Sequence, residues 1–469
     1  MTGDGLVSLG VADAVRLIRK CELSPVELTL AHLERIEQLE PQINSYITVD
    51  ADGALERARQ AERELVRGET STGQPLGPLH GVPLAVKDLF DTRGLRTTAG
   101  AKFFADRIPE QDAEAVRRVR SAGAVLLGKT NLHEIALGLT TVNPHYGACH
   151  NPWALDRVAG GSSGGSAAAL AARLCLGALG SDTGGSIRAP AALCGVVGLK
   201  PTYGRVSLNG AFPLSWNLDH AGPMARSALD AALLLRVLAG YDPDDPASLD
   251  VPGEDYADGI KNGVRGWRVA LAEGEYFKKT QPEIAELVQQ AAGVFESLGA
   301  IVESVDLPGL YDAALANSLV VISDGATVHA ERLNEHPEDF GEDIRERLRR
   351  GAATPLVDYI RARRLQVQAR RQFEQFFERY DLLLLPTTPV TAPPIEGPNA
   401  LELARLLTRY TAPFNLTGVP ALSIPCGFTP DGLPAGLELV GRPWSEAALL
   451  RAASVYEHAT HWNERFPEL

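Results

Sequence analysis

Cysteine is scarce in this sequence, and its spacing excludes two kinds of small scaffold. There are 5 cysteines in 469 residues, and none forms a C-x-x-C pair. They are Cys21, Cys149, Cys175, Cys194 and Cys426. An odd count with irregular spacing indicates neither a disulfide framework nor a zinc site. We therefore interpret the cysteines as small packing residues in a reducing cytoplasm, and we expect no metal.

Two further absences concern membranes and nucleic acids. The N-terminus lacks the positive start and apolar run of a signal peptide. The apolar run 167–179 is shorter than the ~20 residues of a membrane span and contains Arg173. The net charge of −14 disfavours binding to nucleic acid or to anionic membranes. We expect a cytoplasmic protein with neither partner, and its 45% apolar residues are enough for a sizeable core.

What the sequence does contain is two glycine–serine clusters around a small apolar segment. The first is Gly-Gly-Ser-Ser-Gly-Gly-Ser at 160–166, and the second is Gly-Ser-Asp-Thr-Gly-Gly-Ser-Ile-Arg-Ala-Pro at 180–190. Residues 167–179 between them are predicted to form one helix. Glycine lets backbones approach closely, so such loops can aim N–H groups at an oxyanion beside a nucleophilic serine. The fixed Asp182 and Arg188 disfavour a flexible linker, whereas close packing without chemistry stays open.

These clusters resemble the signature of the amidase signature family. Further similarity is found in Gly-Val-Pro-Leu-Ala-Val-Lys-Asp at 81–88, Pro-Phe-Asn-Leu-Thr-Gly-Val-Pro at 413–420 and Gly-Leu-Pro at 432–434. Together the motifs cover most of the chain. The resemblance implies an α/β fold, with a mixed twisted central sheet that helices cover on both faces.

Five segments are expected to share one large domain. Residues 1–75 are predicted to be an N-terminal helical region, 76–240 the catalytic core, 241–306 a linker and β-α-β unit, 307–380 a helical segment at the substrate cleft, and 381–469 a C-terminal core segment. The cleft role of 307–380 is implied by the resemblance alone.

Local signals predict individual elements within these segments. Ser24 before Pro25 predicts a helix start, and Asp50 predicts another. Strands are predicted at 82–87, 125–127, 196–199, 267–271, 301–305 and 382–385, and helices at 112–121, 227–239, 282–298 and from Ser445. The order strand, helix, strand over 267–305 predicts a parallel crossover. Residues 422–428 and 437–440 are predicted to form a hairpin.

A serine nucleophile needs a base, and a lysine can be that base if burial keeps it neutral. Three lysines end apolar runs, namely Lys87, Lys129 and Lys200. The residues alone do not distinguish among them, since each could instead keep its ammonium group in water. No histidine is required for this chemistry.

The resemblance assigns the catalytic roles. It selects Lys87 as the base, Ser186 as the nucleophile and Ser162 as a bridging serine that carries a cis peptide bond. It implies an oxyanion hole made by the backbone N–H groups of Thr183, Gly184, Gly185 and Ser186. It identifies no residue that binds the rest of the substrate.

Other residues of the clusters are expected to be structural. Asp182 and Arg188 are predicted to pair with each other or to bind loop backbone. Ser163, Ser166 and Ser181 have no catalytic role in this interpretation, and we expect hydrogen bonds within the loops from each of them.

Two other motifs are interpreted as chance matches. Residues 123–130 fit the phosphate-loop pattern G-x-x-x-x-G-K-[ST], but the predicted strand lies inside the motif instead of before it. His133-Glu134 begins like the zinc motif H-E-x-x-H, but residue 137 is leucine. We expect neither nucleotide nor zinc binding.

The resulting hypothesis is an amidase that hydrolyses a carboxylic amide through a serine acyl-enzyme. Ester or carbamate cleavage and a homodimer are compatible with it, and its one expected partner is a small amide substrate, without a cofactor. The alternative is the glutamine-amidase subunit of a tRNA-dependent amidotransferase, which the same resemblance fits. Such subunits carry an acidic residue near the position of 407–412 to hold the amino group of glutamine, and this segment has none.

Overall fold

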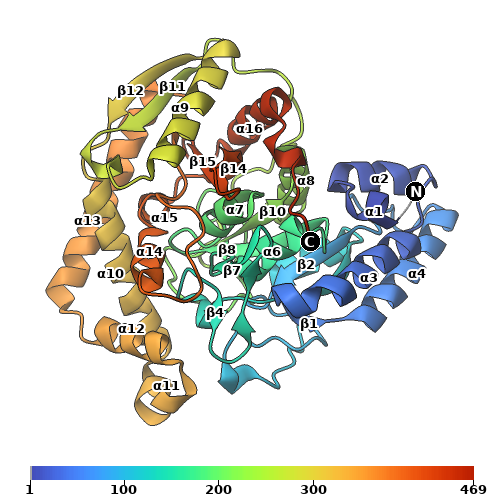
Figure 1. Cartoon of the computed structure of the whole chain (residues 1–469). Coiled ribbons are helices and arrows are strands. Elements are labelled where there is room, and N and C mark those ends of the chain that lie inside the picture. Colours follow the sequence, from blue (N-terminus) through green and yellow to red (C-terminus); the bar gives the residue numbers. More distant parts are fainter. Residues whose placement is uncertain (1–2) are drawn as a thin grey trace.

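The computed structural model describes residues 3–469, and one 11-stranded sheet forms its centre (Figure 1). In spatial order, the strands are β1 (Tyr46–Val49), β3 (Val125–Thr130), β2 (Pro83–Lys87), β8 (Gly177–Asp182), β10 (His220–Ala225), β9 (Val197–Lys200), β14 (Ala421–Phe428), β15 (Pro434–Val440), β13 (Leu382–Pro386), β11 (Arg268–Glu273) and β12 (Ile301–Asp306). Four short strands form two separate ladders, β4 (Val142–Asn143) with β5 (Gly147–Ala148) and β6 (His150–Asn151) with β7 (Ala154–Val158).

Helices lie around this sheet, with α1–α4 at one end of the molecule and α10–α13 at the other (Figure 1). They are α1 (Gly3–Val7), α2 (Val11–Arg19), α3 (Pro25–Ile43), α4 (Ala51–Arg67), α5 (Glu114–Ser121), α6 (Gly164–Ala171), α7 (Arg188–Cys194), α8 (Ala228–Leu238), α9 (Pro282–Ser297), α10 (Leu310–Val328), α11 (Ala330–Glu335), α12 (Glu342–Ala352), α13 (Leu356–Arg379), α14 (Ala400–Leu406), α15 (Ala412–Thr417) and α16 (Glu446–Thr460).

The sheet is mixed, as predicted. Strand β2 is parallel to β3 and β8, and β11 is parallel to β12 and β13, while β8, β10, β9, β14, β15 and β13 pair antiparallel in turn. The parallel crossover predicted over 267–305 is therefore confirmed as β11-α9-β12. The hairpin predicted near the C-terminus is confirmed as β14-β15.

Helices cover both faces of the sheet. Alternate residues of a strand point to opposite sides, so they pack against different helices. On β2, Leu84 and Val86 pack in one apolar cluster with Leu234 of α8, whereas Ala85 packs in another with Ala168 of α6. The predicted α/β fold with a covered, mixed central sheet is confirmed. The division of the chain into five segments stays a prediction.

Two predicted helix starts have the expected caps. The Ser24 hydroxyl accepts hydrogen bonds from the N–H groups of Val26 and Glu27 at 3.0 and 3.2 Å. The Asp50 carboxylate accepts one from Gly53 at 3.2 Å. These caps satisfy N–H groups that a helix leaves without partners in its first turn.

Two predictions need correction. Residues 167–179 do not form one helix, because the chain leaves α6 through Arg173 in a left-handed conformation (φ 61°) and continues as strand β8. Small residues suit both elements here, since a side chain at Gly177 would meet Leu234 and one at Gly180 would meet Ile187. The N-terminal region is not wholly helical either, because residues 46–49 form edge strand β1. Residues 1 and 2 of that region lie outside the described range.

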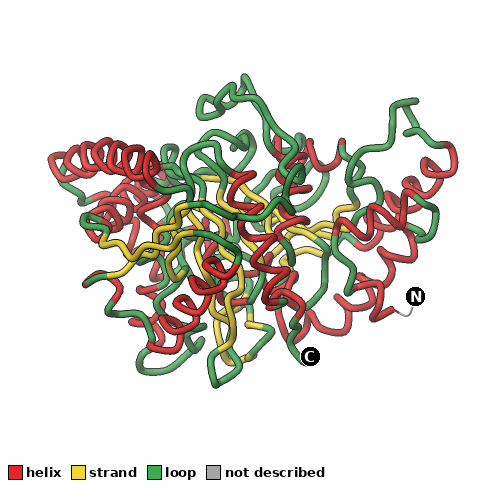
Figure 2. The backbone as a smooth tube through the Cα atoms, turned by 90° about the horizontal axis from the view of Figure 1, so that it is seen from above, coloured by secondary structure: helices red, strands yellow, loops and turns green. Residues whose placement is uncertain are grey.

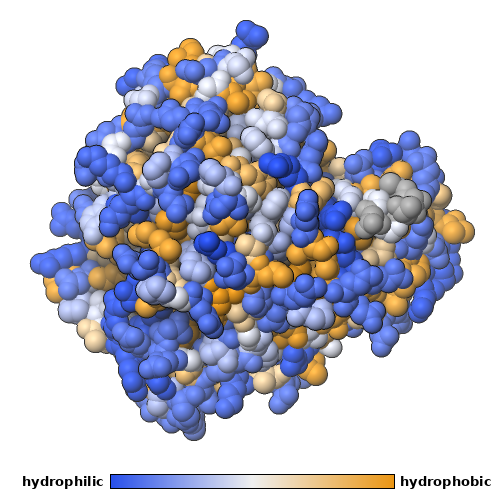
Figure 3. Space-filling model, viewed as in Figure 1, coloured by the Kyte–Doolittle hydropathy of each residue, from blue (hydrophilic) through white to orange (hydrophobic). Residues whose placement is uncertain are grey.

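The view from above shows helices on either side of the strands (Figure 2). Hydrophilic side chains cover most of the face in Figure 3, with apolar residues scattered among them. Within residues 3–469, no helix combines the length and the apolar character needed to cross a membrane.

Candidate active site

Lys87 is the last residue of β2, and three serine hydroxyls surround its amino group. Lys87 Nζ donates hydrogen bonds to Ser162 Oγ at 2.7 Å, Ser163 Oγ at 3.0 Å and Ser181 Oγ at 2.7 Å. Strands β2 and β8 are parallel neighbours, so their carboxyl ends meet at one edge and bring Lys87 beside Ser181. The side chain is 0% exposed. Burial lowers the pKa of Lys87 to about 7, although the carboxylates of Asp182 and Asp219 oppose the change.

Ser162 sits in the turn that leads into α6, and its peptide bond with Gly161 is cis, as the resemblance implies. The Ser162 carbonyl accepts a hydrogen bond from the His133 N–H at 3.2 Å. Gly160 has φ +82°, and a Cβ there would lie 2.7 Å from the backbone of Pro190. The glycines of the first cluster therefore also allow close packing, which the sequence analysis left open. This packing holds the turn with Ser162 against the second cluster.

The second cluster is organised by Asp182 and Arg188. Asp182 accepts hydrogen bonds from the N–H groups of Gly185 and Ile187 at 2.7 and 3.0 Å. The Arg188 Nη2 lies 2.9 Å from Asp182 Oδ1, and its Nη1 lies 2.5 Å from Glu438 Oε1 on β15. Burial raises the pKa of Asp182, but the guanidinium group outweighs this effect and the net pKa is lowered. The predicted structural role of this pair is confirmed.

Ser186 lies between β8 and α7, two residues before the helix begins. It is 5% exposed, and its hydroxyl has no hydrogen-bond partner among residues 3–469. Its carbonyl accepts a hydrogen bond from the Ser163 N–H at 3.2 Å, which joins the two clusters. Of the four predicted oxyanion donors, the Gly185 N–H already binds Asp182. Within the described chain, the N–H groups of Thr183, Gly184 and Ser186 have no acceptor.

Side chains from distant segments fix the shape of the 183–186 loop. Thr411 Oγ1 donates to the Gly184 carbonyl at 2.7 Å, and Thr183 Oγ1 donates to Asp219 at 2.6 Å. From α10, Asn317 Nδ2 donates to the Thr183 carbonyl at 3.3 Å. The Thr408 methyl group also lies close, 3.7 Å from the position that a Cβ at Gly184 would take. The helical segment 307–380 thus contacts the predicted nucleophile loop.

The other two lysines are buried in different surroundings. Lys129 Nζ lies 3.3 Å from Asp88 and donates to the Phe90 carbonyl at 2.7 Å, and burial lowers its pKa to about 8. Lys200 donates to the Val419 carbonyl at 2.6 Å, and burial lowers its pKa as well. Neither contacts a serine hydroxyl, whereas Lys87 contacts three. Lys129 also lies within strand β3, so the strand does lie inside the phosphate-loop pattern of residues 123–130, as predicted.

Sequence analysis did not identify two hydrogen-bond partners of Lys87. Ser163 and Ser181 were expected to bind loop groups only, and Ser163 does donate to the Ser181 carbonyl at 3.1 Å. Both also contact Lys87, which nothing in their spacing indicated. Ser166 fits the prediction, since it bonds with Thr130 at 2.8 Å and with the Leu179 carbonyl at 3.1 Å.

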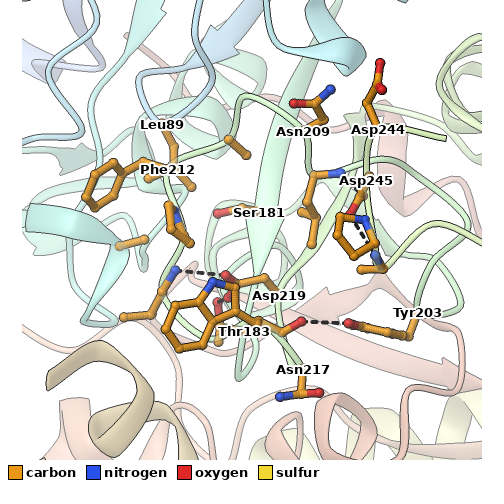
Figure 4. A pocket seen from close by; sticks show the side chains of 18 residues that line it. Leu89, Ser181, Thr183, Tyr203, Asn209, Phe212, Asn217, Asp219, Asp244 and Asp245 are labelled. Atoms are coloured by element: carbon orange, nitrogen blue, oxygen red, sulfur yellow. Dashed lines mark hydrogen bonds between the residues drawn. The ribbon is translucent and has the colours of Figure 1, made fainter. Parts of the chain in front are cut away.

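A cavity of about 400 Å³ opens beside these residues, with Ser181 and Thr183 in its wall (Figure 4). This volume suits a small organic group.

The fold is a mixed α/β sheet with helices on both faces, and the site combines a buried lysine with three serine hydroxyls. Residues 27–450 match the family model described as Amidase, and the chain belongs to the amidase signature family, whose members cleave carbon–nitrogen bonds. The chain is 41% identical to a glutamyl-tRNA(Gln) amidotransferase subunit from Moorella thermoacetica, over 97% of each chain.

Two solved structures show the same fold. One comes from a vestigial protein complex described as revealing the origins of an s-triazine catabolic enzyme, with a TM-score of 0.91 and 34% identity over 96% of this chain and 99% of that chain. The other is the peptide amidase of Stenotrophomonas maltophilia, with a TM-score of 0.85 and 34% identity over 98% of each chain.

Proposed function

We propose that this chain hydrolyses carboxylic amides through an acyl-enzyme on Ser186, with Lys87 as the base. The observation that carries the proposal is the contact between Lys87 Nζ and Ser162 Oγ at 2.7 Å, with both side chains buried. Neutral Lys87 accepts the proton of Ser162, and Ser162 takes the proton of Ser186 as its oxygen attacks the amide carbon. The carbonyl oxygen becomes an oxyanion near the N–H groups of the 183–186 loop. One such donor is worth ~2.7–4 kcal/mol in a transition state.

The same proton then completes the acylation step. Ser162 donates it to the substrate nitrogen, Lys87 returns its proton to Ser162, the carbon–nitrogen bond breaks, and a neutral amine leaves. Water attacks the acyl-enzyme next, while Ser162 accepts its proton and passes its own to Lys87. As the ester bond breaks, Ser162 protonates the Ser186 oxygen and Lys87 returns its proton to Ser162, so that acid and free Ser186 are released. Because Gly185 N–H already binds Asp182, we assign the oxyanion to the N–H groups of Thr183, Gly184 and Ser186.

Two candidate functions are compatible with this chemistry, and they differ in the class of substrate. The first is an amidase that acts alone, as the similarity to a peptide amidase permits. It is supported by the segment 407–412, which carries no acidic side chain and whose Thr408 lies beside Gly184, because amidotransferase subunits carry an acidic residue around this segment to hold the amino group of glutamine. The second is the glutamine-hydrolysing subunit of a tRNA-dependent amidotransferase, and the similarity to the amidotransferase protein from Moorella thermoacetica favours it over the first.

One assay separates the candidates. The purified chain is incubated with aryl, alkyl and primary amides and with glutamine, in the absence of ATP and tRNA. Release of amine from simple amides supports the first candidate. Glutamine hydrolysis that begins only when the other amidotransferase subunits are added supports the second. The chain would then belong to a complex that uses tRNA, contrary to the expectation of no nucleic-acid partner.

A further inference from the structure

The cavity beside the 183–186 loop has a mostly apolar wall with acidic but no basic side chains. Aromatic and apolar groups form most of its wall, among them Tyr203, Phe212 and Trp216 (Figure 4). Three of its polar residues carry carboxylates, Asp219, Asp244 and Asp245, and none of the residues that line it is a lysine, arginine or histidine. An anionic group would meet only like charge there, and burial against apolar walls would strengthen that repulsion.

The three carboxylates are not equally available to a ligand. Asp219 accepts hydrogen bonds from Thr183 Oγ1 at 2.6 Å and from the Leu214 N–H at 2.8 Å. Asp245 accepts them from the N–H groups of Leu208 and Ala247 at 2.7 and 2.8 Å.

Asp244 differs from these two carboxylates. Its backbone N–H is held by Asp242 at 3.0 Å, but its carboxylate is exposed and receives no hydrogen bond from residues 3–469. Asp244 therefore lies at the exposed rim of the cavity, and its carboxylate points outward and remains free for a ligand that extends past the rim (Figure 4).

The position of the cavity indicates which end of an amide it would receive. Ser181 lines it, and Ser181 Oγ lies 2.7 Å from Lys87 Nζ. Lys87 in turn contacts Ser162, the residue that delivers the proton to the leaving nitrogen in the proposed reaction. The other neighbours of the loop, Asn317 and Thr408, lie against Thr183 and Gly184 and do not line the cavity.

We propose that this cavity binds the amine side of the substrate, and that the preferred leaving group is an apolar or aromatic amine with a cationic end facing Asp244. This inference rests on the proposed function, because it assigns one end of the amide to one side of the site. The chemistry is consistent with product release as well. A released alkylamine takes up a proton from water near neutral pH, and the resulting ammonium ion suits an acidic cavity with aromatic walls.

A binding experiment tests the cavity without relying on turnover. Benzyltrimethylammonium, benzyl alcohol and benzoate have similar sizes and differ in charge, and each is titrated into the protein by calorimetry. We expect the cation to bind most tightly and benzoate not to bind. Asp244→Asn should weaken the cation about two- to fivefold, the effect of losing one exposed charge pair, and leave benzyl alcohol unchanged.

Glu296→Gln on α9 is the matched control, because it removes one exposed carboxylate outside the cavity, and it should change nothing. Trp216→Ala should weaken the cation and the alcohol alike, since both would lose the same aromatic surface. Benzoate binding as tight as the cation, or an Asp244→Asn protein with unchanged affinity, would overturn the inference.

Kinetics then connect the cavity to the reaction. Two N-benzyl amides with the same acyl group are compared, one with a para-aminomethyl and one with a para-carboxylate group on the benzyl ring. A higher kcat/KM for the cationic amide, reduced in Asp244→Asn, supports the inference. Equal cleavage of both amides would overturn the inference and leave the proposed function intact. Asp244-dependent binding without cleavage of any amide would overturn the proposed function, and the leaving-group role with it.

Discussion

Lys87 Nζ lies 2.7 Å from Ser162 Oγ, and both side chains are 0% exposed. A lysine in water is almost entirely protonated at neutral pH, because its ordinary pKa is near ~10.4. Burial disfavours the ammonium form. The hydroxyls of Ser162 and Ser181 are able to donate a hydrogen bond to the neutral amine, while the Ser163 hydroxyl donates to the Ser181 carbonyl. The neutral amine that a base requires is therefore present in quantity near pH 7, where the pKa of Lys87 lies at about 7.

This relationship predicts the pH dependence of hydrolysis. The active form is neutral Lys87, and its population grows as pH rises through the lowered pKa. We expect kcat/KM to rise with pH through about 7 and to level off on the alkaline side. Lys87→Arg should be inactive at every pH, because guanidinium stays protonated. Exposed Lys261→Arg is the control and should keep the wild-type profile. Substantial activity in Lys87→Arg would place the base elsewhere.

The nucleophile can be tested separately from the base. Ser186→Ala removes the attacking oxygen, and the hydroxyl it removes has no hydrogen bond with the described residues, so stability should be unchanged. We expect kcat to fall at least about 1000-fold, as in other serine hydrolases that lose the nucleophile. A fluorophosphonate probe should label wild type on the peptide that contains Ser186 and leave the variant unlabelled. Ser318→Ala, on the exposed side of α10, controls for the substitution itself. Retention of more than a few per cent of activity would exclude Ser186.

The fold could be predicted from local signals where one pattern dominates. The β11-α9-β12 crossover and the β14-β15 hairpin follow from apolar runs separated by turn residues. The helix expected at 167–179 failed because a run of small apolar residues has no period that separates a buried helix from a buried strand. Its division into α6 and β8 depends on tertiary packing against Leu234 and Ile187, which a sequence does not display.

The site could be predicted to a similar extent. Family resemblance assigned Lys87 and Ser162 to one site, and the structure brings them into contact. The contacts of Ser163 and Ser181 with Lys87 could not be foreseen, because they require the register between β2 and β8. The cavity at Asp244 draws its wall from strands and loops far apart in the chain, so no local motif marks it.

The buried ion pair behind the loop predicts a strong effect on stability. Arg188→Met would leave the carboxylates of Asp182 and Glu438 buried without their cation, since both now contact Arg188 at 2.9 Å or less. Breaking such a pair costs about 3–5 kcal/mol, and urea unfolding should show a loss of this size. Arg188→Lys should not restore it, because one ammonium cannot serve the separated acceptors that the guanidinium reaches.

A second variant distinguishes a charge effect from lost packing. The double change Arg188→Met with Asp182→Asn removes one of the stranded charges, so it should be less destabilised than Arg188→Met alone. If the double variant is as unstable as the sum of the two single variants, the pair is not coupled and the argument from buried charge is wrong.

Gly185 is the position at which the loop has least tolerance for a side chain. Its φ of +132° is one that L-residues rarely adopt, and a Cβ there would lie 2.1 Å from Thr411 Oγ1. Gly185→Ala should therefore displace Thr411, break its 2.7 Å hydrogen bond to the Gly184 carbonyl and move the N–H groups beside Ser186. Strain and overpacking together should cost about 2–4 kcal/mol of stability. We expect kcat to fall much more than affinity for a substrate-like amide, because misplaced N–H groups are felt most in the transition state.

Gly253→Ala is the matched control, since that glycine has open space around its Cβ position and no positive φ, and it should behave as wild type. Thr411→Ala in the Gly185→Ala background would remove the clashing hydroxyl but not the backbone strain, so it should recover stability only in part. Full recovery of activity in that double variant would show that the φ of residue 185 is not what the loop requires.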